Sequence, residues 1–111
     1  MNTSKIGRIG EMKARAFLKF KLYKILEGNY KRRTGEIDII AKKGEYIVFI
    51  EVKYRKNLKM GYPLEAVDFK KQERIRKTAM VYLAEKGLDC DVRFDCVEIL
   101  GNKISHIENA F

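Results

Sequence analysis

The sequence predicts an α/β fold in which one open, mixed sheet of five strands has a helix packed on each face. Three observations lead to this class. The composition is 46% hydrophobic and 35% charged with a single proline, which is typical of a compact mixed α/β domain. Neither a linker nor an internal repeat divides the chain. The length of 111 residues suffices for one hydrophobic core and not for two, so we expect a single domain over residues 1–111.

The first helix is predicted from residue 4 to about residue 20. Ser4 is a suitable N-cap, and few β-branched residues follow it. Helical spacing groups one face of this segment, which consists of Gly7, Glu11, Ala14 and Leu18. An acid is out of place on a packing face. Glu11 therefore either reaches acids of the strands as a further ligand of a metal or water, or pairs with a lysine at the margin.

The remaining elements follow from apolar segments and turn residues. Strands are predicted at residues 23–26, 36–42, 46–54, 92–100 and 103–107, with a basic turn at residues 31–35 and a mobile loop at residues 57–63. A second helix is predicted from Pro63 to residue 86, with or without a break near Asp68, and Gly87 supplies its stop. Its apolar stripe consists of Ile75, Ala79, Tyr82 and Leu83.

The second and third predicted strands are joined by a short lysine-glycine turn, which indicates an antiparallel hairpin. A loop of Lys43-Gly44 places Asp38 opposite Phe49 and diagonal to Glu51. A loop of Gly44-Glu45 places Asp38 directly opposite Glu51. Both registers put the two acids on one face of the sheet.

Three charged residues interrupt these otherwise apolar strands: Asp38 on the first strand of the hairpin, and Glu51 and Lys53 on the second. An ionised carboxylate out of water is costly unless a partner or a metal satisfies it. Alternation along the strand puts Lys53 on the same face as Glu51. The pattern is typical of a metal-dependent nuclease site. The alternative is a cluster of lysine and carboxylates on a wet sheet face.

Hydrolysis of a phosphodiester requires neutralisation of an anionic group, activation of a water and stabilisation of the leaving oxygen. Mg²⁺ or Mn²⁺ bound by Asp38 and Glu51 meets the first two needs, and the backbone carbonyl of Val52 is a further candidate ligand. Lys53 is placed to orient or deprotonate the water and to stabilise the transition state. Cys90 and Cys96 lack the spacing of a zinc or redox site, so we expect reduced thiols and no small-molecule cofactor.

Positive charge is concentrated in the sequence next to Asp38, Glu51 and Lys53. The net charge is +9 and the pI is about 9.6, which favours a polyanionic partner such as DNA. The candidate contacts to nucleic acid are Arg32, Arg33, Arg55, Lys56, Lys59, Lys71 and Arg74. Lys71 lies one helical turn before Ile75, so its ammonium either reaches a phosphate near the strands or turns to water. The alternative for the basic runs is that they are solvated surfaces.

Other features of the sequence concern location and the remaining polar residues. No segment has the length of a membrane span, and the N-terminus lacks the apolar stretch of a secretory signal, so we expect a cytoplasmic protein outside membranes. His106, the only histidine, lies far in sequence from the acids, and we expect a packing or surface role. Asp95 is expected to orient Arg93 or to help shape the site.

The spacing of Asp38 and Glu51-Val52-Lys53 resembles the motif of the PD-(D/E)xK, or restriction-endonuclease-like, superfamily. Motifs along nearly the whole chain resemble the YraN-like family of small bacterial proteins, and they are Gly7-x-x-Gly10-Glu11, Gly35-Glu36-Ile37-Asp38, Phe49-Ile50-Glu51-Val52-Lys53, Glu65-Ala66-Val67, Arg93-Phe94-Asp95 and His106-Ile107-Glu108-Asn109-Ala110-Phe111. The resemblance implies a restriction-endonuclease-like fold and an endonuclease distantly related to archaeal Holliday junction resolvases. It assigns metal-binding and catalytic places to Asp38, Glu51 and Lys53, and that of a metal-directed helix acid to Glu11. The proline of the superfamily name is absent, since Ile37 precedes Asp38.

The sequence thus leads to a metal-dependent, structure-selective DNA endonuclease as the first hypothesis. No base-reading element is visible, so specificity would come from the shape of branched or flapped DNA. A homodimer would present two sites to a branch, and the final strand is the candidate for pairing across a two-fold axis. The alternative is an adaptor that binds nucleic acid without cleaving it.

Overall fold

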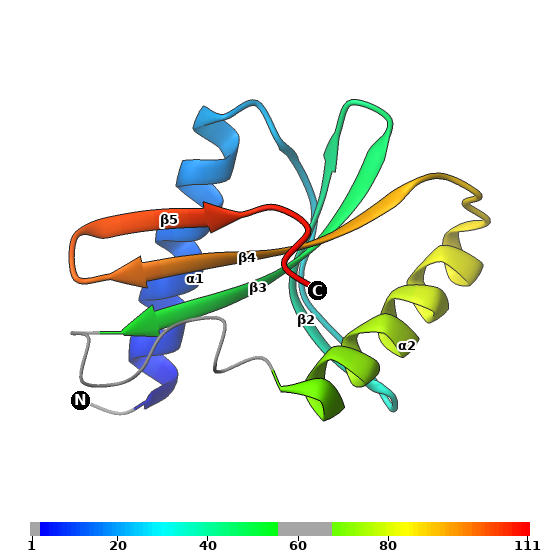
Figure 1. The fold of residues 1–111 in the computed structure, drawn as a ribbon, viewed down its shortest axis with the longest axis horizontal. Coiled ribbons are helices and arrows are strands. Elements are labelled where there is room, and N and C mark those ends of the chain that lie inside the picture. The colour runs from blue at the N-terminus through cyan, green and yellow to red at the C-terminus, as the bar shows by residue number, and fades with distance from the viewer. Residues whose placement is uncertain (1–2, 56–67) are drawn as a thin grey trace.

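The computed structural model describes residues 3–55 and 68–111. The elements in chain order are α1 (Thr3–Phe20), β1 (Lys24–Arg32), β2 (Gly35–Lys43), β3 (Tyr46–Arg55), α2 (Phe69–Lys86), β4 (Val92–Leu100) and β5 (Lys103–Ile107) (Figure 1). Lys56 and Lys59, the predicted mobile loop and the predicted helix start at Pro63 lie outside the described residues.

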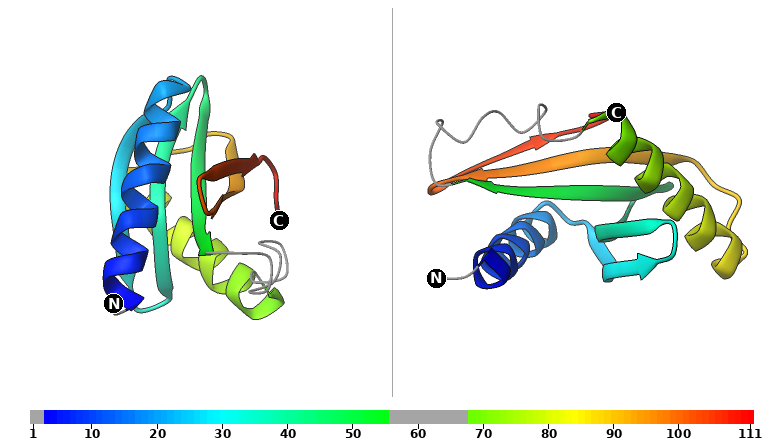
Figure 2. Two further views of the ribbon diagram at one scale, coloured as in Figure 1. Left: turned by 90° about the vertical axis from the view of Figure 1, so that its left-hand side faces the viewer. Right: turned by 90° about the horizontal axis from the view of Figure 1, so that it is seen from below.

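The five strands form one sheet in the order β1-β2-β3-β4-β5. β3 and β4 run parallel, and the other neighbouring strands run antiparallel. Helix α1 packs on one face and α2 on the other (Figure 2). The predicted α/β class, with a mixed five-stranded sheet flanked by helices, is confirmed and is consistent with a restriction-endonuclease-like fold. In the part of the chain that the structure describes, no helix is long and apolar enough to cross a membrane.

Alternation along the strands directs apolar side chains into two cores, one beneath each helix. The core beneath α1 contains Ala14, Leu18, Tyr23, Ile39, Ala41, Val48, Ile50, Val97 and Ile99. The core beneath α2 contains Tyr30, Ile37, Ile40, Ile47, Phe49, Ile75, Ala79 and Tyr82, with Leu83 packed against it. The predicted apolar stripe of the second helix is therefore confirmed.

Helix α1 packs through a face that differs in part from the predicted one. It begins at Thr3, so Ser4 lies within the helix and not at its N-cap. Gly7 is exposed, whereas Gly10 is buried. A Cβ at Gly10 would lie 2.9 Å from the Cβ of Tyr54, so a glycine is needed where the helix approaches β3. The close approach at position 10 sets which face of the helix turns inward.

Strand β1 is longer than predicted, because residues expected in a turn pair with β2. It extends to Arg32, and only Arg33-Thr34 forms the turn. Gly28-Asn29 favours a turn locally, and Asn29 has a positive φ of 52°. Pairing along β2 overrides that preference, because the register continues unchanged from Glu27 to Arg32. A register shift, typical of a β-bulge, lies earlier in the strand, between Ile25 and Glu27.

The β2–β3 hairpin adopts one of the two predicted registers. Lys43 pairs with Tyr46, so the turn consists of Gly44 and Glu45. Gly44 has a φ of 59°, which costs glycine little and other residues more. This register aligns Asp38 with Glu51.

Helix α2 has a capping residue at each end. The carboxylate of Asp68 accepts a hydrogen bond of 2.8 Å from the backbone N–H of Lys71, as an N-cap does. Gly87 closes the helix with a left-handed φ of 61°. The start at Asp68 coincides with the predicted break, and it sets the first turn of α2 beside β3.

Candidate active site

The candidate site lies where β2 separates from β3. The last backbone pair between these strands joins Ile39 to Ile50. Beyond it, the side chain of Asp38 makes the contact instead, since its Oδ2 accepts a hydrogen bond of 2.8 Å from the backbone N–H of Val52. The carboxylate therefore occupies the space between the diverging strands, and it satisfies an N–H that would otherwise lack a partner in the ladder.

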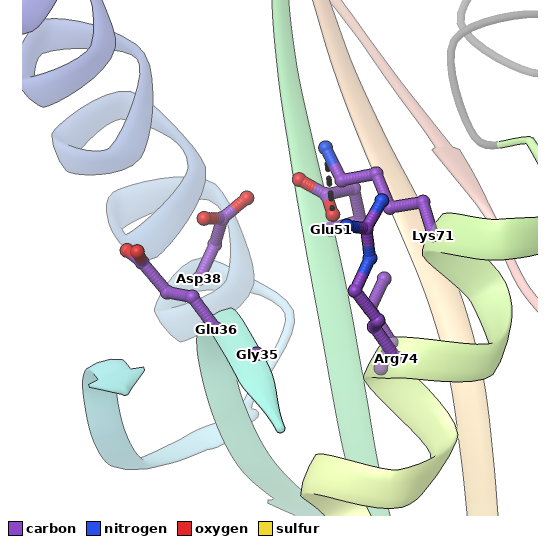
Figure 3. Close-up of a pocket in the computed structure, with 7 residues that line it drawn as sticks. Gly35, Glu36, Asp38, Glu51, Lys71 and Arg74 are labelled. Carbon is purple, nitrogen blue, oxygen red and sulfur yellow. Dashed lines mark ion pairs between the residues drawn. The ribbon is translucent and has the colours of Figure 1, made fainter. Parts of the chain in front are cut away.

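A cavity of about 460 Å³ opens beside this carboxylate. It is lined by Gly35, Glu36, Asp38, Glu51, Lys71, Arg74 and Ile75. Figure 3 shows the acids of β2 on one side and the basic side chains of α2 on the other, with Glu51 of β3 beside Lys71. Gly35 allows α2 to come close, because a Cβ there would lie 3.1 Å from Oγ1 of Thr78.

The two predicted metal-binding acids meet in this cavity. The side chains of Asp38 and Glu51 share a hydrogen bond, and Glu51 is only 6% exposed. Burial raises the pKa of Asp38, the neighbouring Glu51 raises it further, and the result is about 8 although the N–H of Val52 and the charge of Lys71 oppose the shift. Without a metal, the pair therefore holds one proton at neutral pH.

Two lysines accompany Glu51. The ammonium of Lys71 lies 3.3 Å from Oε2 of Glu51, so this side chain turns to the site. Lys53 forms a side-chain hydrogen bond with Lys71, and its pKa is lowered first by burial and then by that neighbour. The pKa of Lys71 is raised, because Lys53 and the charge of Glu51 together outweigh the effect of burial. A less basic and a more basic lysine thus stand side by side.

Glu11 of α1 lies near Asp38 without lining the cavity. Burial raises the pKa of Glu11, and the charge of Asp38 raises it as well. The carboxylate accepts a hydrogen bond from the side chain of Asn29 and lies 4.0 Å from the guanidinium of Arg15. The acid thus pairs with an arginine of its own helix, while it remains within electrostatic reach of the strand acids. Its role as a metal or water ligand stays a prediction.

The donor atoms of the cavity suit a hard divalent cation. Within residues 3–55 and 68–111, no group of three or more histidine, cysteine, aspartate or glutamate residues is placed to hold a metal ion. The backbone carbonyl of Val52 adds a further oxygen ligand. The N–H of Val52 points at Asp38, and the C=O of a strand residue points to the same side as its N–H. Mg²⁺ commonly takes one or two carboxylates and fills its other positions with water and phosphate oxygens. Asp38, Glu51 and Val52 therefore fit Mg²⁺ or Mn²⁺.

The predicted nucleic-acid contacts differ in where the structure places them. Lys71 and Arg74 line the cavity, and Arg33 is exposed at the β1–β2 turn. Arg32 instead forms an ion pair of 3.2 Å with Glu85 near the end of α2 and stacks on the ring of Tyr30. The side chain of Arg55 belongs, with Lys56 and Lys59, to the part of the chain that the structure leaves out.

Three residues near the site escaped sequence reasoning. Glu36 lines the cavity. Parallel pairing sets Cys96 beside Glu51 and Glu98 beside Lys53, and Glu98 is only 7% exposed. Burial raises the pKa of the Cys96 thiol to about 12, so this thiol stays protonated. Alternation in residues 92–100 places Cys96 and Glu98 on one face, but only the strand order reveals which residues that face meets.

His106 and Asp95 form a buried network on the α1 face of the sheet. Asp95 is fully buried and accepts hydrogen bonds from Arg93 at 2.8 Å and from His106 at 2.7 Å. The other ring nitrogen of His106 lies 2.8 Å from the ammonium of Lys21. The structure thus confirms a packing role for the histidine and the pairing of Asp95 with Arg93.

Comparison with known proteins adds the family. Residues 10–99 match the family described as "Uncharacterised protein family UPF0102". A UPF0102 protein of Fusobacterium nucleatum is 49% identical over 110 residues, which cover 98% of this chain and 92% of that protein. A UPF0102 protein of Acetivibrio thermocellus is 48% identical over 121 residues, with 99% and 93% covered, and one of Clostridioides difficile is 46% identical over 114 residues, with both chains covered completely. The predicted resemblance is confirmed, and the chain belongs to the uncharacterised protein family UPF0102, the YraN-like family.

Proposed function

We propose that this protein is a cytoplasmic, divalent-metal-dependent endonuclease that hydrolyses phosphodiester bonds in DNA, with branched or flapped DNA as the favoured substrate. One observation carries the proposal: Asp38 and Glu51 converge from two strands in an open cavity that Lys71 also lines, with Lys53 beside Lys71. Family membership alone assigns no activity, so the proposal depends on the chemistry of this site.

The proposed reaction assigns tasks to the two acids, the two lysines and one backbone carbonyl of the site. Asp38, Glu51 and the carbonyl of Val52 would hold Mg²⁺ or Mn²⁺, which supplies charge neutralisation at the phosphate and acidifies a bound water. Lys53 loses its proton more readily than an ordinary lysine, so it can accept one from the attacking water. Lys71 is cationic and faces the cavity, where it offers charge to a phosphate oxygen.

DNA would be held through its backbone. The net charge of +9 attracts a polyanion, and Arg74 adds a planar donor at the cavity. Arg33, Arg55, Lys56 and Lys59 are proposed to extend this grip. Arg32 is proposed with them, because its ion pair with Glu85 is exposed on both sides and therefore weak. Backbone contacts carry no sequence information, so selectivity would come from DNA shape.

A homodimer is proposed to match a branched substrate. Strand β5 lies at an edge of the sheet, and an edge strand presents unpaired backbone groups to a second copy. Pairing of β5 across a two-fold axis would place two cavities on one particle. Sedimentation equilibrium measures this state directly, and a monomer at all concentrations would contradict the dimer without affecting the proposed chemistry.

Cleavage of labelled DNA tests the proposed activity. Four-way junction, flap, single-stranded and duplex substrates are incubated with Mg²⁺ or Mn²⁺, and wild type is compared with Asp38→Asn and Lys53→Ala. We expect wild type to cleave DNA, and we expect no cleavage with chelator or in either variant. Glu45→Gln is the matched control, because it removes an exposed carboxylate from the turn of the same hairpin and should cleave normally.

A non-catalytic adaptor remains the second candidate. It is favoured by the ion pair of Lys71 with Glu51. It is also favoured because, among the described residues, no three histidine, cysteine, aspartate or glutamate side chains are placed to hold a metal ion. An adaptor would bind a DNA structure tightly and cleave none of the four substrates with either metal. Cleavage that Asp38→Asn removes, while binding persists, would exclude it.

A further inference from the structure

Two acids and two lysines lie together at the candidate site. Lys71 contacts Glu51 at 3.3 Å and hydrogen-bonds with Lys53, while Glu51 hydrogen-bonds with Asp38. Glu51 thus has the ammonium of Lys71 as its counter-ion within the protein. A carboxylate paired in this way needs no external ion to compensate its charge.

A divalent cation would disturb this pairing. Glu51 is 6% exposed and Lys71 is 34% exposed, so the ammonium covers a carboxylate that is otherwise enclosed by protein. A cation bound to Glu51 would face a positive charge a few ångström away, and such repulsion is strong where water is scarce. The ammonium and the cation therefore compete for the same oxygens.

Lys71 is the group able to leave. It extends from the first turn of α2 on a flexible stem and reaches solvent in part. Lys53 is fixed by its place on β3, between β2 and β4. The cavity that Lys71 lines also contains Arg74, so the ammonium can turn away from Glu51 toward an anion held at the same opening.

We propose that Lys71 is an internal counter-ion that occupies Glu51 in the metal-free protein, is displaced when a divalent cation binds, and then binds a phosphate of the DNA. This inference rests on the proposed metal-dependent function. It makes metal and DNA mutually reinforcing ligands, because each favours the form in which Lys71 has left Glu51. Lys71 is a positioning residue in the metal-free state and a substrate contact in the loaded state.

Binding of Mn²⁺ without DNA tests the first part, with free Mn²⁺ followed by electron paramagnetic resonance. Lys71→Met removes the ammonium and keeps an apolar stem, and we expect it to tighten Mn²⁺ binding about tenfold. Lys71→Arg keeps the charge and should bind like wild type. Lys70→Met removes an adjacent, exposed charge and should change the affinity less than about twofold. Melting curves verify that each variant is folded.

The outcomes separate this inference from the proposed function. If Asp38→Asn abolishes Mn²⁺ binding but Lys71→Met leaves the affinity unchanged or weaker, the metal site stands and the counter-ion is refuted. If Mn²⁺ binding survives Asp38→Asn, the proposed metal site fails and the counter-ion fails with it. If Lys71→Met is the only lysine variant that binds Mn²⁺ more tightly than wild type, and Asp38→Asn abolishes binding, the results support both the metal site and the counter-ion.

Binding of a four-way junction with and without Ca²⁺ tests the second part. Wild type should gain affinity when Ca²⁺ is added, and Lys71→Met should lose most of that gain. A loss of equal size with and without Ca²⁺ would identify Lys71 as a fixed phosphate contact and overturn the displacement. Lys70→Met again controls for the loss of one positive charge.

Discussion

Replacement of Asp38 by asparagine should stabilise the metal-free protein, and the gain should grow with pH. Asparagine keeps the geometry of the protonated acid, because its oxygen can accept from Val52 and its amide can donate to Glu51. The variant loses only the ability to ionise. Any difference in stability that appears as the pH rises therefore reports the cost of charging Asp38 in the folded protein.

The pKa values give the size and the sign of this effect. Asp38 titrates near 8 in the folded protein and near its ordinary value of 3.8 in the unfolded chain. Because the folded value is raised, its contribution to stability is fully present below pH 4 and is lost as the pH rises toward 8. One pH unit corresponds to about 1.4 kcal/mol, so the ceiling is about 6 kcal/mol. Water in the open cavity reduces it, and we expect about 1–3 kcal/mol near pH 8.

Urea unfolding followed by far-ultraviolet circular dichroism measures the effect, since the chain has no tryptophan. Wild type, Asp38→Asn and the control Glu45→Gln are compared with chelator near pH 5 and near pH 8. An equal difference at both pH values, or a less stable Asp38→Asn at the higher one, would refute the reasoning. Addition of Mg²⁺ near pH 8 should then stabilise wild type and not Asp38→Asn.

Three further predictions follow from particular contacts. Lys53→Met should slow single-turnover cleavage about 100-fold and leave junction binding in gel-shift assays nearly unchanged, since its lysine acts on water. Gly10→Ala should lower the free energy of unfolding in urea by about 1–3 kcal/mol, because its Cβ would lie 2.9 Å from a β3 side chain, whereas Gly7→Ala has open space and should be neutral or stabilising. Asp95→Asn should cost about 3 kcal/mol in urea unfolding, because it removes the buried carboxylate that pairs with Arg93 and leaves only the exposed Glu108 as an acidic partner of that arginine. Burial raises the pKa of Asp95, but hydrogen bonds from His106, Arg93 and Asn109 outweigh burial and lower it. Wild type should therefore lose this stabilisation as the pH falls through the lowered pKa, whereas the stability of Asp95→Asn should not depend on this titration.

The fold class and the acidic pair were predictable because they depend on local patterns. Period-two alternation in residues 36–42 and 46–54 requires Asp38 and Glu51 to share a face in either register. The apolar stripe of α2 and its stop at Gly87 follow from helical spacing and from the left-handed conformation that glycine accepts. Such signals involve residues close in sequence, and at these positions the tertiary contacts agree with them.

The extent of β1 was not predictable in this way. Gly28-Asn29 carries a local turn preference, and the backbone of β2 supplies hydrogen bonds that outweigh it. The register of the β2–β3 hairpin was likewise left open by two turns of similar composition, and the structure selects Gly44-Glu45. Pairing between strands decides both cases.

Local patterns in the sequence suffice to predict an α/β domain with two carboxylates and a lysine on neighbouring strands, since periodicity and turn chemistry act over a few residues. The ion pairs of Lys71 with Glu51 and of Arg32 with Glu85, and the position of Glu98 beside Lys53, emerge from the three-dimensional structure. These contacts join segments far apart in the chain, and they depend on strand order and on the placement of α2 over the sheet. Local patterns leave both of these open, whereas burial of two cores against a single sheet fixes them.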